Sequence, residues 1–379
     1  MNTNLNFIVN STDLYKTVQE MGKIVSGTKS TLPILDYFLF EVMGSVLNIT
    51  ASNLEITVTA EMVIENRDGD GKFTMPAKLF LDTLKNIPSQ PLVMEIDNYT
   101  INLKTDRGLF TMMGVDPNDF PKSPYVDKAN PLSFVTTMVL SGINRTLFAT
   151  AKDELRPVMN GILFDIKKNN ISFVASDAHK MMVYEAENAV SDNDRDFQVI
   201  LPSKAANVIK SLLPKGGEYI TFSADEKNAV FIINGYTVAC RLVEGNYPAY
   251  KSVIPTNNDN NIVVEKDALL ATLKRVSLSS NQASNLIQLS IKEGKITVSA
   301  SDIDFGNSAT EWIGCEHDGN DIEIGFKGSY LIEILSNLVC DNVNIKLSDP
   351  TRAGLFYPME QKDDNEKTLA LLMPMMINV

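Results

Sequence analysis

Histidine and cysteine are scarce in this chain, and long apolar runs are missing. Only two histidines occur among the 379 residues, too few for a histidine-rich metal site or a histidine-based relay. The three cysteines, Cys240, Cys315 and Cys340, are too few and too odd in number for a disulfide framework. No apolar run reaches the roughly 18 residues that cross a bilayer, and the first residues lack the basic and apolar parts of a signal peptide. We therefore expect a cytoplasmic protein with no membrane contact.

Basic residues are also in deficit. The chain has 34 Lys and Arg against 47 Asp and Glu, a net charge of −13. This balance ordinarily counts against nucleic-acid binding, because cationic contacts to phosphate supply most of the non-specific affinity for a duplex. The net charge does not reveal where the charges lie. Whether the chain can bind nucleic acid therefore depends on how the charges are distributed along it.

Three segments of the sequence read alike, namely 47–54, 171–178 and 296–303. Their Ala-Ser pairs end at Ser52, Ser176 and Ser301, which are 124 and 125 residues apart. A second set of similar segments, at nearly the same separation, is 73–80, 199–206 and 324–331. Similarity at a fixed period indicates a repeated structural unit. The sequence therefore predicts three versions of one domain, with boundaries at 1–127, 128–256 and 257–379.

Each predicted domain has the same coarse layout. An amphipathic helix comes first, strand runs divided by turn dipeptides follow, and a second helix begins after a Pro or Lys-Gly-Ser element. Two helices packed on antiparallel sheets, three times over, form an α+β architecture. The six expected helices cover 11–27, 76–87, 140–153, 202–215, 265–280 and 326–338.

Two segments approach ligand-binding loops without completing them. Residues 22–30 are similar to a phosphate-cradling loop, but Thr28 stands where lysine is required, and the segment follows a helix rather than a strand. Residues 66–71 mimic the start of a calcium loop, yet its twelfth position is Ala77, which cannot supply a carboxylate. We expect a surface loop at the first segment and a hairpin turn at the second.

A catalytic constellation is missing as well. His179 follows Asp177 closely, but no Ser or Cys elbow accompanies the two residues. Asp302 and Asp304 form a carboxylate pair on an expected strand, with no nucleophile or histidine near them in the sequence. The cysteines fit no zinc spacing. We therefore expect no metal, no cofactor and no enzymatic activity.

The basic residues gather on the expected helices. Those six helices carry a net charge of +6, so the rest of the chain carries −19. Helix surfaces generally favour lysine, which would explain the difference without a function. The alternative is that all six helices line one concave face that meets a polyanion, with the acidic strands outside. The cations expected on the solvent side are Lys78, Lys85, Arg145, Lys152, Lys204 and Lys210.

Five short motifs are spread along the whole chain, at 30–35, 159–164, 175–180, 242–250 and 372–375. With these motifs in this order, the chain resembles the beta subunits of bacterial DNA polymerase III, the sliding clamps. The resemblance implies a non-catalytic processivity factor, a head-to-tail homodimer in which each subunit forms half of a closed ring. Twelve helices about 10 Å apart would line a circle about 38 Å across. Subtracting one helix thickness leaves about 28 Å, which is wider than B-form DNA.

The resemblance also implies a hydrophobic pocket, between the second and third domains, that receives short linear peptides of partner proteins. The corresponding residues are Met159, Ser176, Ala178, His179, Lys180, Met181, Pro248, Val253, Leu371, Leu372, Met373, Pro374 and Met375. The family usually has Gly and Arg where this chain has Ala178 and Lys180. A basic residue is common in the family at the position of Ser252, and Met376 stands where Arg is usual. We therefore expect peptide selectivity that relies less on charge.

A lining, a seam and a set of partners follow from the same resemblance. The DNA-facing residues of such a ring would be Lys29, Lys78, Lys85, Arg145, Lys152, Lys204 and Lys210. The dimer seam would join Arg107, Leu109 and Phe110 to Leu278, Asp302 and Asp304. The implied partners are a second copy of the chain, double-stranded DNA, the polymerase III catalytic subunit, the clamp loader and other proteins with a clamp-binding motif. The implied location is the cytoplasm, at the nucleoid.

Two other interpretations stay open. The nearly complete loops suit an enzyme of phosphate or nucleotide chemistry, which would need a metal or a nucleophile that the sequence does not supply. The second interpretation is a repeat scaffold that binds only protein. Retention on circular but not on linear DNA separates a clamp from such a scaffold.

Overall fold

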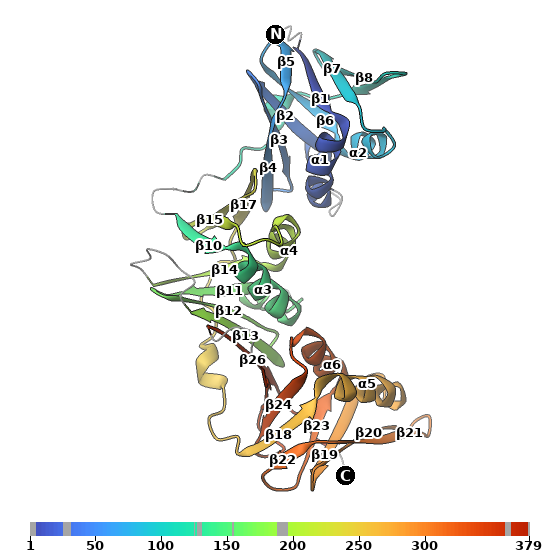
Figure 1. Cartoon of the computed structure of the whole chain (residues 1–379), viewed down its shortest axis with the longest axis vertical. Coiled ribbons are helices and arrows are strands. Elements are labelled where there is room, and N and C mark those ends of the chain that lie inside the picture. Colours follow the sequence, from blue (N-terminus) through green and yellow to red (C-terminus); the bar gives the residue numbers. More distant parts are fainter. Residues whose placement is uncertain are drawn as a thin grey trace. The chain divides into compact units, whose positions relative to one another are not determined.

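The computed structural model describes residues 5–25, 32–124, 126, 131–153, 155–187, 196–360 and 365–377 (Figure 1). The chain divides into two compact units. Unit 1 comprises Met1–Thr137 and Lys204–Leu242, and unit 2 comprises Met138–Ser203 and Val243–Val379. None of the helices in the described residues is long and apolar enough to cross a membrane.

All three repeats have one order of elements: a strand, a helix, four or five strands, a second helix and three strands. The first repeat contains β1 (Leu5–Asn10), α1 (Ser11–Val25), β2 (Tyr37–Met43), β3 (Val46–Ser52), β4 (Ile56–Val63), β5 (Glu65–Asp68), β6 (Gly71–Pro76), α2 (Ala77–Lys85), β7 (Pro91–Asp97), β8 (Thr100–Lys104) and β9 (Leu109–Met113). The second contains β10 (Leu132–Val135), α3 (Thr136–Thr146), β11 (Gly161–Ile166), β12 (Asn170–Ser176), β13 (Lys180–Glu187), β14 (Phe197–Pro202), α4 (Ser203–Leu212), β15 (Tyr219–Ala224), β16 (Asn228–Ile233) and β17 (Tyr236–Arg241). The third contains β18 (Asn260–Glu265), α5 (Lys266–Val276), β19 (Leu286–Lys292), β20 (Lys295–Asp302), β21 (Asn307–Gly314), β22 (Glu316–Asp318), β23 (Ile322–Lys327), α6 (Gly328–Asn337), β24 (Asn342–Leu347), β25 (Gly354–Pro358) and β26 (Glu366–Leu372).

The elements confirm the threefold repeat and correct two of its details. Each repeat begins with a strand, which precedes the helix that the sequence predicts as the first element. The third helix, predicted over 140–153, starts earlier, at Thr136. The backbone N–H of Thr136 donates to the carbonyl oxygen of Glu218 at 2.8 Å, which anchors this end of the helix to the loop before β15. The helix ends at Thr146 and continues only as a short 3₁₀ turn, η3 (Leu147–Ala149).

Main-chain hydrogen bonds join consecutive repeats inside each unit. Unit 1 holds a five-stranded sheet of order β5-β1-β7-β8-β9 and an eight-stranded sheet of order β10-β15-β16-β17-β4-β3-β2-β6. Unit 2 holds a nine-stranded sheet of order β14-β11-β12-β13-β26-β25-β24-β18-β22 and a four-stranded sheet of order β21-β20-β19-β23. The joints are the antiparallel pairs β17 with β4 and β26 with β13. In both joints, the last strand of one repeat pairs with the fourth strand of the repeat before it.

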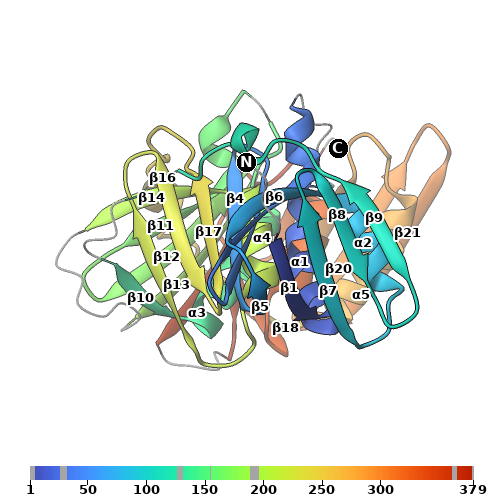
Figure 2. The same cartoon turned by 90° about the horizontal axis from the view of Figure 1, so that it is seen from above.

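Two strands at the corresponding positions of the repeat, β9 and β21, are not paired with a neighbouring repeat in the described residues. β9 is the last strand of the first repeat and ends the five-stranded sheet; β21 is the fourth strand of the third repeat and ends the four-stranded sheet. Figure 2 shows β7, β8 and β9 side by side with β9 outermost. Unpaired edges of this kind are templates for pairing with another chain.

Residues 66–71 do not form the predicted hairpin. β5 pairs with β1 in the five-stranded sheet, whereas β6 pairs with β2 in the eight-stranded sheet. The turn therefore connects two sheets of unit 1. Asp70 fixes it, because its Oδ1 accepts the backbone N–H of Gly44 at 2.8 Å.

The predicted apolar faces of the helices are buried. In unit 1, Leu14 and Val18 of α1 are fully covered, as the helical spacing of the apolar residues predicts. Phe80 of α2 meets the ring of Phe40 edge-on, with 5.7 Å between centroids, and Phe40 stacks on Phe73 at 4.9 Å. Such aromatic pairs stabilise beyond the area they bury, so α2 is held firmly on its sheet.

Gly142 marks a tight contact between α3 and β12. A Cβ atom at this position would lie 2.6 Å from the ring of Phe173. That ring cannot retreat, because it is fully buried between Phe164 and Tyr184, at centroid distances of 4.6 and 5.9 Å. We expect Gly142→Ala to lower the free energy of unfolding by about 1–3 kcal/mol, as overpacked cores do. Urea unfolding monitored by circular dichroism measures this effect.

Gly22 in α1 supplies the matched control. A Cβ there would lie 2.5 Å from Cδ1 of Leu81, the mobile end of a half-buried side chain. Gly22→Ala is therefore expected to be neutral or to gain up to about 1 kcal/mol from helix propensity. Equal effects of the two substitutions would contradict the tight contact at Gly142.

Candidate functional site

The residues predicted for the peptide pocket lie on segments that meet within unit 2. Residues 176–181 form the end of β12, a turn and the start of β13. β13 pairs with β26, so that Lys180 is opposite Leu372. The chain after β26 continues along the turn, because the backbone N–H of Met373 donates to the carbonyl oxygen of His179 at 2.8 Å.

An apolar cluster lies beside this joint. Met181 and Leu371, opposite each other across the joint, are both buried in it. The other buried members are Leu163, Val174, Val183, Ile200, Tyr250, Ala353 and Leu355, and Val158, Val243, Tyr247, Ile254, Tyr357 and Leu369 pack against them. The expected pocket residues Met181 and Leu371 therefore belong to a continuous apolar core and do not stand alone.

Leu372 is fully buried as well, whereas several other expected residues are more accessible. Val253, at the end of the 3₁₀ turn η5 (Tyr250–Val253), is 58% exposed, and Met373 is 43% exposed. Pro248 is exposed, whereas Met159, Pro374 and Met375 are half-buried. Exposed apolar groups next to a buried apolar cluster are typical of a surface that receives another apolar group.

The turn between β12 and β13 is held by two side chains. Oγ of Ser176 accepts the backbone N–H of Ala178 at 3.1 Å, and Oδ1 of Asp177 accepts those of His179 and Lys180, both at 2.9 Å. Ala178 has a φ of 73°, in the left-handed region that favours glycine. The fixed turn sets the directions of His179 and Lys180.

Lys180 is enclosed by partners from two elements. Its Nζ lies 2.8 Å from Oδ2 of Asp177 and 3.1 Å from Oε2 of Glu333 in α6, and its side chain is 5% exposed. It also lies 4.2 Å from the ring centroid of Tyr330. Burial alone would lower the pKa of Lys180, but the hydrogen bonds and charges of Asp177 and Glu333 outweigh it and raise that pKa. The ammonium group is thus charged and already paired within the protein.

His179 has a structural contact of its own. Its ring stacks on Tyr330, with 5.9 Å between centroids and 28° between planes. Together with the ammonium group of Lys180, it fixes the position of the Tyr330 ring. The His179 ring is thus part of the packing between the turn and α6.

The same turn recurs in unit 1 and carries a strained residue. Leu54 is equivalent to Ala178 by the repeat and has a φ of 72°, although it is not glycine and its side chain is 53% exposed. The left-handed conformation costs about 1–2 kcal/mol for an L-residue, and glycine loses about 0.5–1 kcal/mol more backbone entropy on folding. We expect Leu54→Gly to raise the free energy of unfolding by about 0.5–1 kcal/mol, measured by urea unfolding. Leu54→Ala keeps the Cβ atom and should bring no such gain; an equal gain from alanine would sink this explanation.

Most of the expected DNA-facing cations lie at the surface. Those that are exposed are Lys78, Lys85, Lys152, Lys204 and Lys210. Lys204 forms an ion pair with Glu55 at 3.2 Å, with both side chains more than 60% exposed. Such exposed pairs contribute little, so the ammonium group of Lys204 can exchange partners. Lys29 lies outside the described residues.

Arg145 does not lie on the solvent side of its helix. Its side chain is 17% exposed, with Nη1 3.2 Å from Glu366 and 3.0 Å from Oγ1 of Thr368. The guanidinium group also lies 4.7 Å from the ring centroid of Tyr184. Helical periodicity places it among polar positions, but a strand distant in the sequence covers it. Arg145 therefore joins β13 and β26, and the predicted position on the solvent side of the helix is wrong at this residue.

The expected seam residues lie at or beside the two edges β9 and β21. Leu109 and Phe110 belong to β9 and are 57% and 41% exposed, and Arg107 precedes them in an exposed bend. Leu278, in the turn after α5, is 85% exposed. Apolar side chains exposed to this degree on an edge strand are typical of an interface.

The acidic part of the predicted seam needs a correction. Asp302 is 4% exposed, and its Oδ1 accepts the backbone N–H of Asp304 at 3.1 Å. Its carboxylate therefore stabilises its own turn, whereas Asp304 is exposed. Ile303 and Phe305, which the sequence did not single out, are 92% and 78% exposed between β20 and β21. Two apolar residues inside a turn, where polar ones are usual, were the available signal.

The described part of the chain holds no metal-binding cluster, and Cys240 is not a reactive thiol. Within those residues, no three His, Cys, Asp or Glu side chains gather closely enough to hold a metal ion. Burial raises the pKa of Cys240 to about 12, so its thiol is protonated at neutral pH and is inert as a nucleophile.

Models of three consecutive domains of one family match the chain. They describe the DNA polymerase III beta subunit, with the N-terminal domain at residues 5–124, the central domain at 135–249 and the C-terminal domain at 251–376. The beta sliding clamp of Pseudomonas putida is 26% identical over 372 residues, which are 98% of this chain and 100% of that protein. The beta sliding clamp of Synechococcus elongatus is 28% identical over 320 residues, which are 83% and 84% of the two chains.

Solved structures are similar over the same length. The crystal structure of the DNA polymerase III subunit beta from Pseudomonas aeruginosa superposes with a TM-score of 0.93 at 25% identity, covering 98% of this chain and 100% of that one. The DNA polymerase sliding clamp from Bacillus subtilis has a TM-score of 0.92 at 21% identity, covering 99% and 100%, a likeness of fold.

Proposed function

The chain belongs to the DNA polymerase III beta subunit family, and from this premise we propose that it acts as a sliding clamp. In this role it encircles duplex DNA without sequence specificity and tethers polymerase and other replication proteins. It is a processivity factor and not an enzyme. The protein would work in the cytoplasm, at the nucleoid.

The observation that carries this proposal is the repeated joint between domains. β17 pairs with β4 and β26 pairs with β13, so that the last strand of one repeat pairs with the fourth strand of another. By the same rule, β9, a last strand, would pair with β21, a fourth strand. If β9 of each copy pairs with β21 of the other, two further joints of the same kind form in the dimer. Both of these sheet edges are then paired. The proposed assembly is therefore a head-to-tail homodimer that closes into a ring of six domains, with boundaries near 1–127, 128–256 and 257–379 in each copy.

The proposed contact with DNA is made by scattered lysines. Lys78, Lys85, Lys204 and Lys210 are exposed on the helices α2 and α4, whereas Lys152, predicted on a helix, is exposed in the loop after η3. Ammonium groups on flexible side chains contact phosphates without reading bases. Because the closed ring would retain DNA by topology, weak contacts suffice, and they let the protein slide.

The proposed docking surface for partner peptides is the apolar patch around the β13–β26 joint. Met373 and Val253 are its exposed apolar groups, and Met181 and Leu371 are its buried base. Lys180 is already paired with Asp177 and Glu333, which supports selectivity based more on apolar contacts than on charge.

A retention assay tests the proposal. The protein is loaded onto nicked circular plasmid with a clamp loader, and DNA-bound protein is separated by gel filtration before and after the plasmid is linearised. A clamp stays on the circle and is lost from the linear form. A protein-binding scaffold is retained on neither, and that outcome would refute the proposed function.

A further inference from the structure

The two joints between domains are built alike in their main chain. In unit 1 the backbone N–H of Arg241 donates to the carbonyl oxygen of Glu55 at 2.9 Å, and in unit 2 that of Met373 donates to His179 at 2.8 Å. Ile56 pairs with Cys240 in the first joint, in the place that Lys180 takes opposite Leu372 in the second. Residues of the two joints can therefore be compared position by position.

Their side chains differ, and the difference opens a space in unit 1. In unit 2, Lys180 bridges to Glu333 and lies against Tyr330, so these side chains fill the gap between turn and helix. α4 and α6 start at equivalent positions, Ser203 and Gly328, which makes Val208 the counterpart of Glu333 and Ala205 that of Tyr330. The equivalents in unit 1 are thus smaller or apolar, and none of them forms the bridge.

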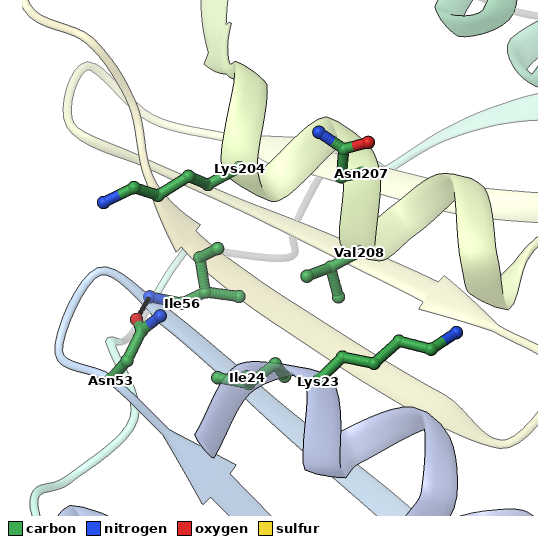
Figure 3. Close-up of a pocket in the computed structure, with 7 residues that line it drawn as sticks. All are labelled: Lys23, Ile24, Asn53, Ile56, Lys204, Asn207 and Val208. Atoms are coloured by element: carbon green, nitrogen blue, oxygen red, sulfur yellow. Dashed lines mark hydrogen bonds between the residues drawn. The ribbon is translucent and has the colours of Figure 1, made fainter. Parts of the chain in front are cut away.

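A pocket of about 310 Å³ lies at this place in unit 1. It is lined by Lys23, Ile24, Asn53, Ile56, Lys204, Asn207 and Val208. Figure 3 shows Ile24, Ile56 and Val208 pointing toward one another, while the side chains of Lys23 and Lys204 extend to opposite sides. The volume is at the small end of ligand sites and suits one or two side chains of a peptide.

The lining combines an apolar floor with cations at the margin. Ile24 and Ile56 are each 3% exposed and form part of the floor. Lys204 is paired with Glu55 at 3.2 Å, and Lys23 with Glu20 at 2.5 Å, all in exposed or half-exposed positions. Exposed ion pairs are weak, so a carboxylate on a ligand can compete for either lysine.

We propose that this pocket is a second docking site, which binds a short peptide segment of a partner protein through an aliphatic side chain flanked by a carboxylate. This proposal rests on the proposed clamp function in one respect, because a clamp has partner proteins that could carry such a peptide. Duplex DNA is the weaker candidate, because a phosphate backbone gains nothing from three aliphatic side chains. Single-stranded bases stack on aromatic rings, and none lines this pocket.

Methyl NMR on the full-length protein tests the site directly. The probe is acetyl-Leu-Asp-amide, and the signals are the δ1 methyl groups of Ile24 and Ile56, with Ile262 of β18, which does not line the pocket, as the reference. We expect saturable shifts at Ile24 and Ile56, with a midpoint in the millimolar range, and none at Ile262. Acetyl-Leu-Asn-amide should bind about two- to fivefold more weakly, as the loss of one exposed ion pair predicts. Acetyl-Gly-Asp-amide should give no saturable shift.

Two variants separate the site from a general effect. Val208→Trp fills the pocket and should abolish the shifts. Lys204→Gln, an exposed change that leaves the fold intact, should weaken the Asp probe to the level of the Asn probe and leave the Asn probe unchanged. Shifts that stay linear with concentration, an equal response to the Gly probe, or shifts produced by a duplex oligonucleotide and not by the peptides would overturn the proposal. The plasmid assay is independent of these signals, so failure of either hypothesis is seen separately.

Discussion

Replacing Phe110 with aspartate is expected to convert the assembled protein into monomers of 41.9 kDa that no longer stay on circular DNA. Phe110 is 41% exposed on β9, where Leu109 is 57% exposed. In the proposed seam, this edge meets the edge of β21 together with Ile303 and Phe305, which are 92% and 78% exposed. A carboxylate buried there without a partner costs several kcal/mol, so each seam should weaken by about 10²- to 10³-fold. Because the ring has two seams, closure should be lost. Light scattering after gel filtration measures the mass.

A matched control removes an exposed apolar group elsewhere on the same unit. Val63 is 81% exposed at the end of β4, and β4 is already paired on both sides, by β3 and β17. Val63→Asp introduces the same charge without touching either free edge, so its mass and its retention on circular DNA should equal those of wild type. A dimeric Phe110→Asp protein would count against the β9–β21 seam. Monomers from both variants would point to a general loss of assembly instead.

The architecture could be predicted from the sequence because duplication leaves its trace in the chain itself. The Ala-Ser motifs at Ser52, Ser176 and Ser301 fall on the equivalent strands β3, β12 and β20. The helices α2, α4 and α6, which begin within the second set of repeated segments, are equivalent too. Which strands pair with each other could not be predicted in the same way. β5 and β6 look like a hairpin in sequence, yet they belong to different sheets, since pairing depends on strands far away along the chain. The start of α3 was missed for the same reason, because the loop that anchors it lies beyond residue 210.

Exposure of single side chains was harder to predict than their grouping. Arg145 reads as a surface cation, but it is covered by a strand that packs on it from another part of unit 2. Asp302 reads as half of a carboxylate pair, but it is buried and satisfies the backbone of its own turn. In each case the sequence shows the charge, and only the tertiary partners decide whether that charge is available to a ligand.

Replacing Val253 with aspartate is expected to weaken binding of a clamp-binding peptide by at least about 30-fold, the loss typical of an interface hot spot. Val253 ends η5, whose first residue, Tyr250, is buried in the apolar cluster with Met181 and Leu371. A peptide side chain that covers Val253 removes water from it, and an aspartate there would lose its hydration without gaining a partner. Fluorescence anisotropy with a fluorescein-labelled peptide that carries the family's clamp-binding motif measures the affinity.

The control for this variant is Val339→Asp in the same unit. Val339 is 47% exposed after α6 and is not among the residues of the proposed docking surface, so its replacement should leave peptide affinity unchanged. Both valines are about half exposed, and the free energy of unfolding should change by less than about 0.5 kcal/mol in either variant. Retention on circular DNA is expected to persist in both, because the seam at β9 and β21 is untouched. Unchanged affinity in Val253→Asp would mean that partner peptides dock elsewhere on this chain, while the ring and its hold on DNA would stand unaffected.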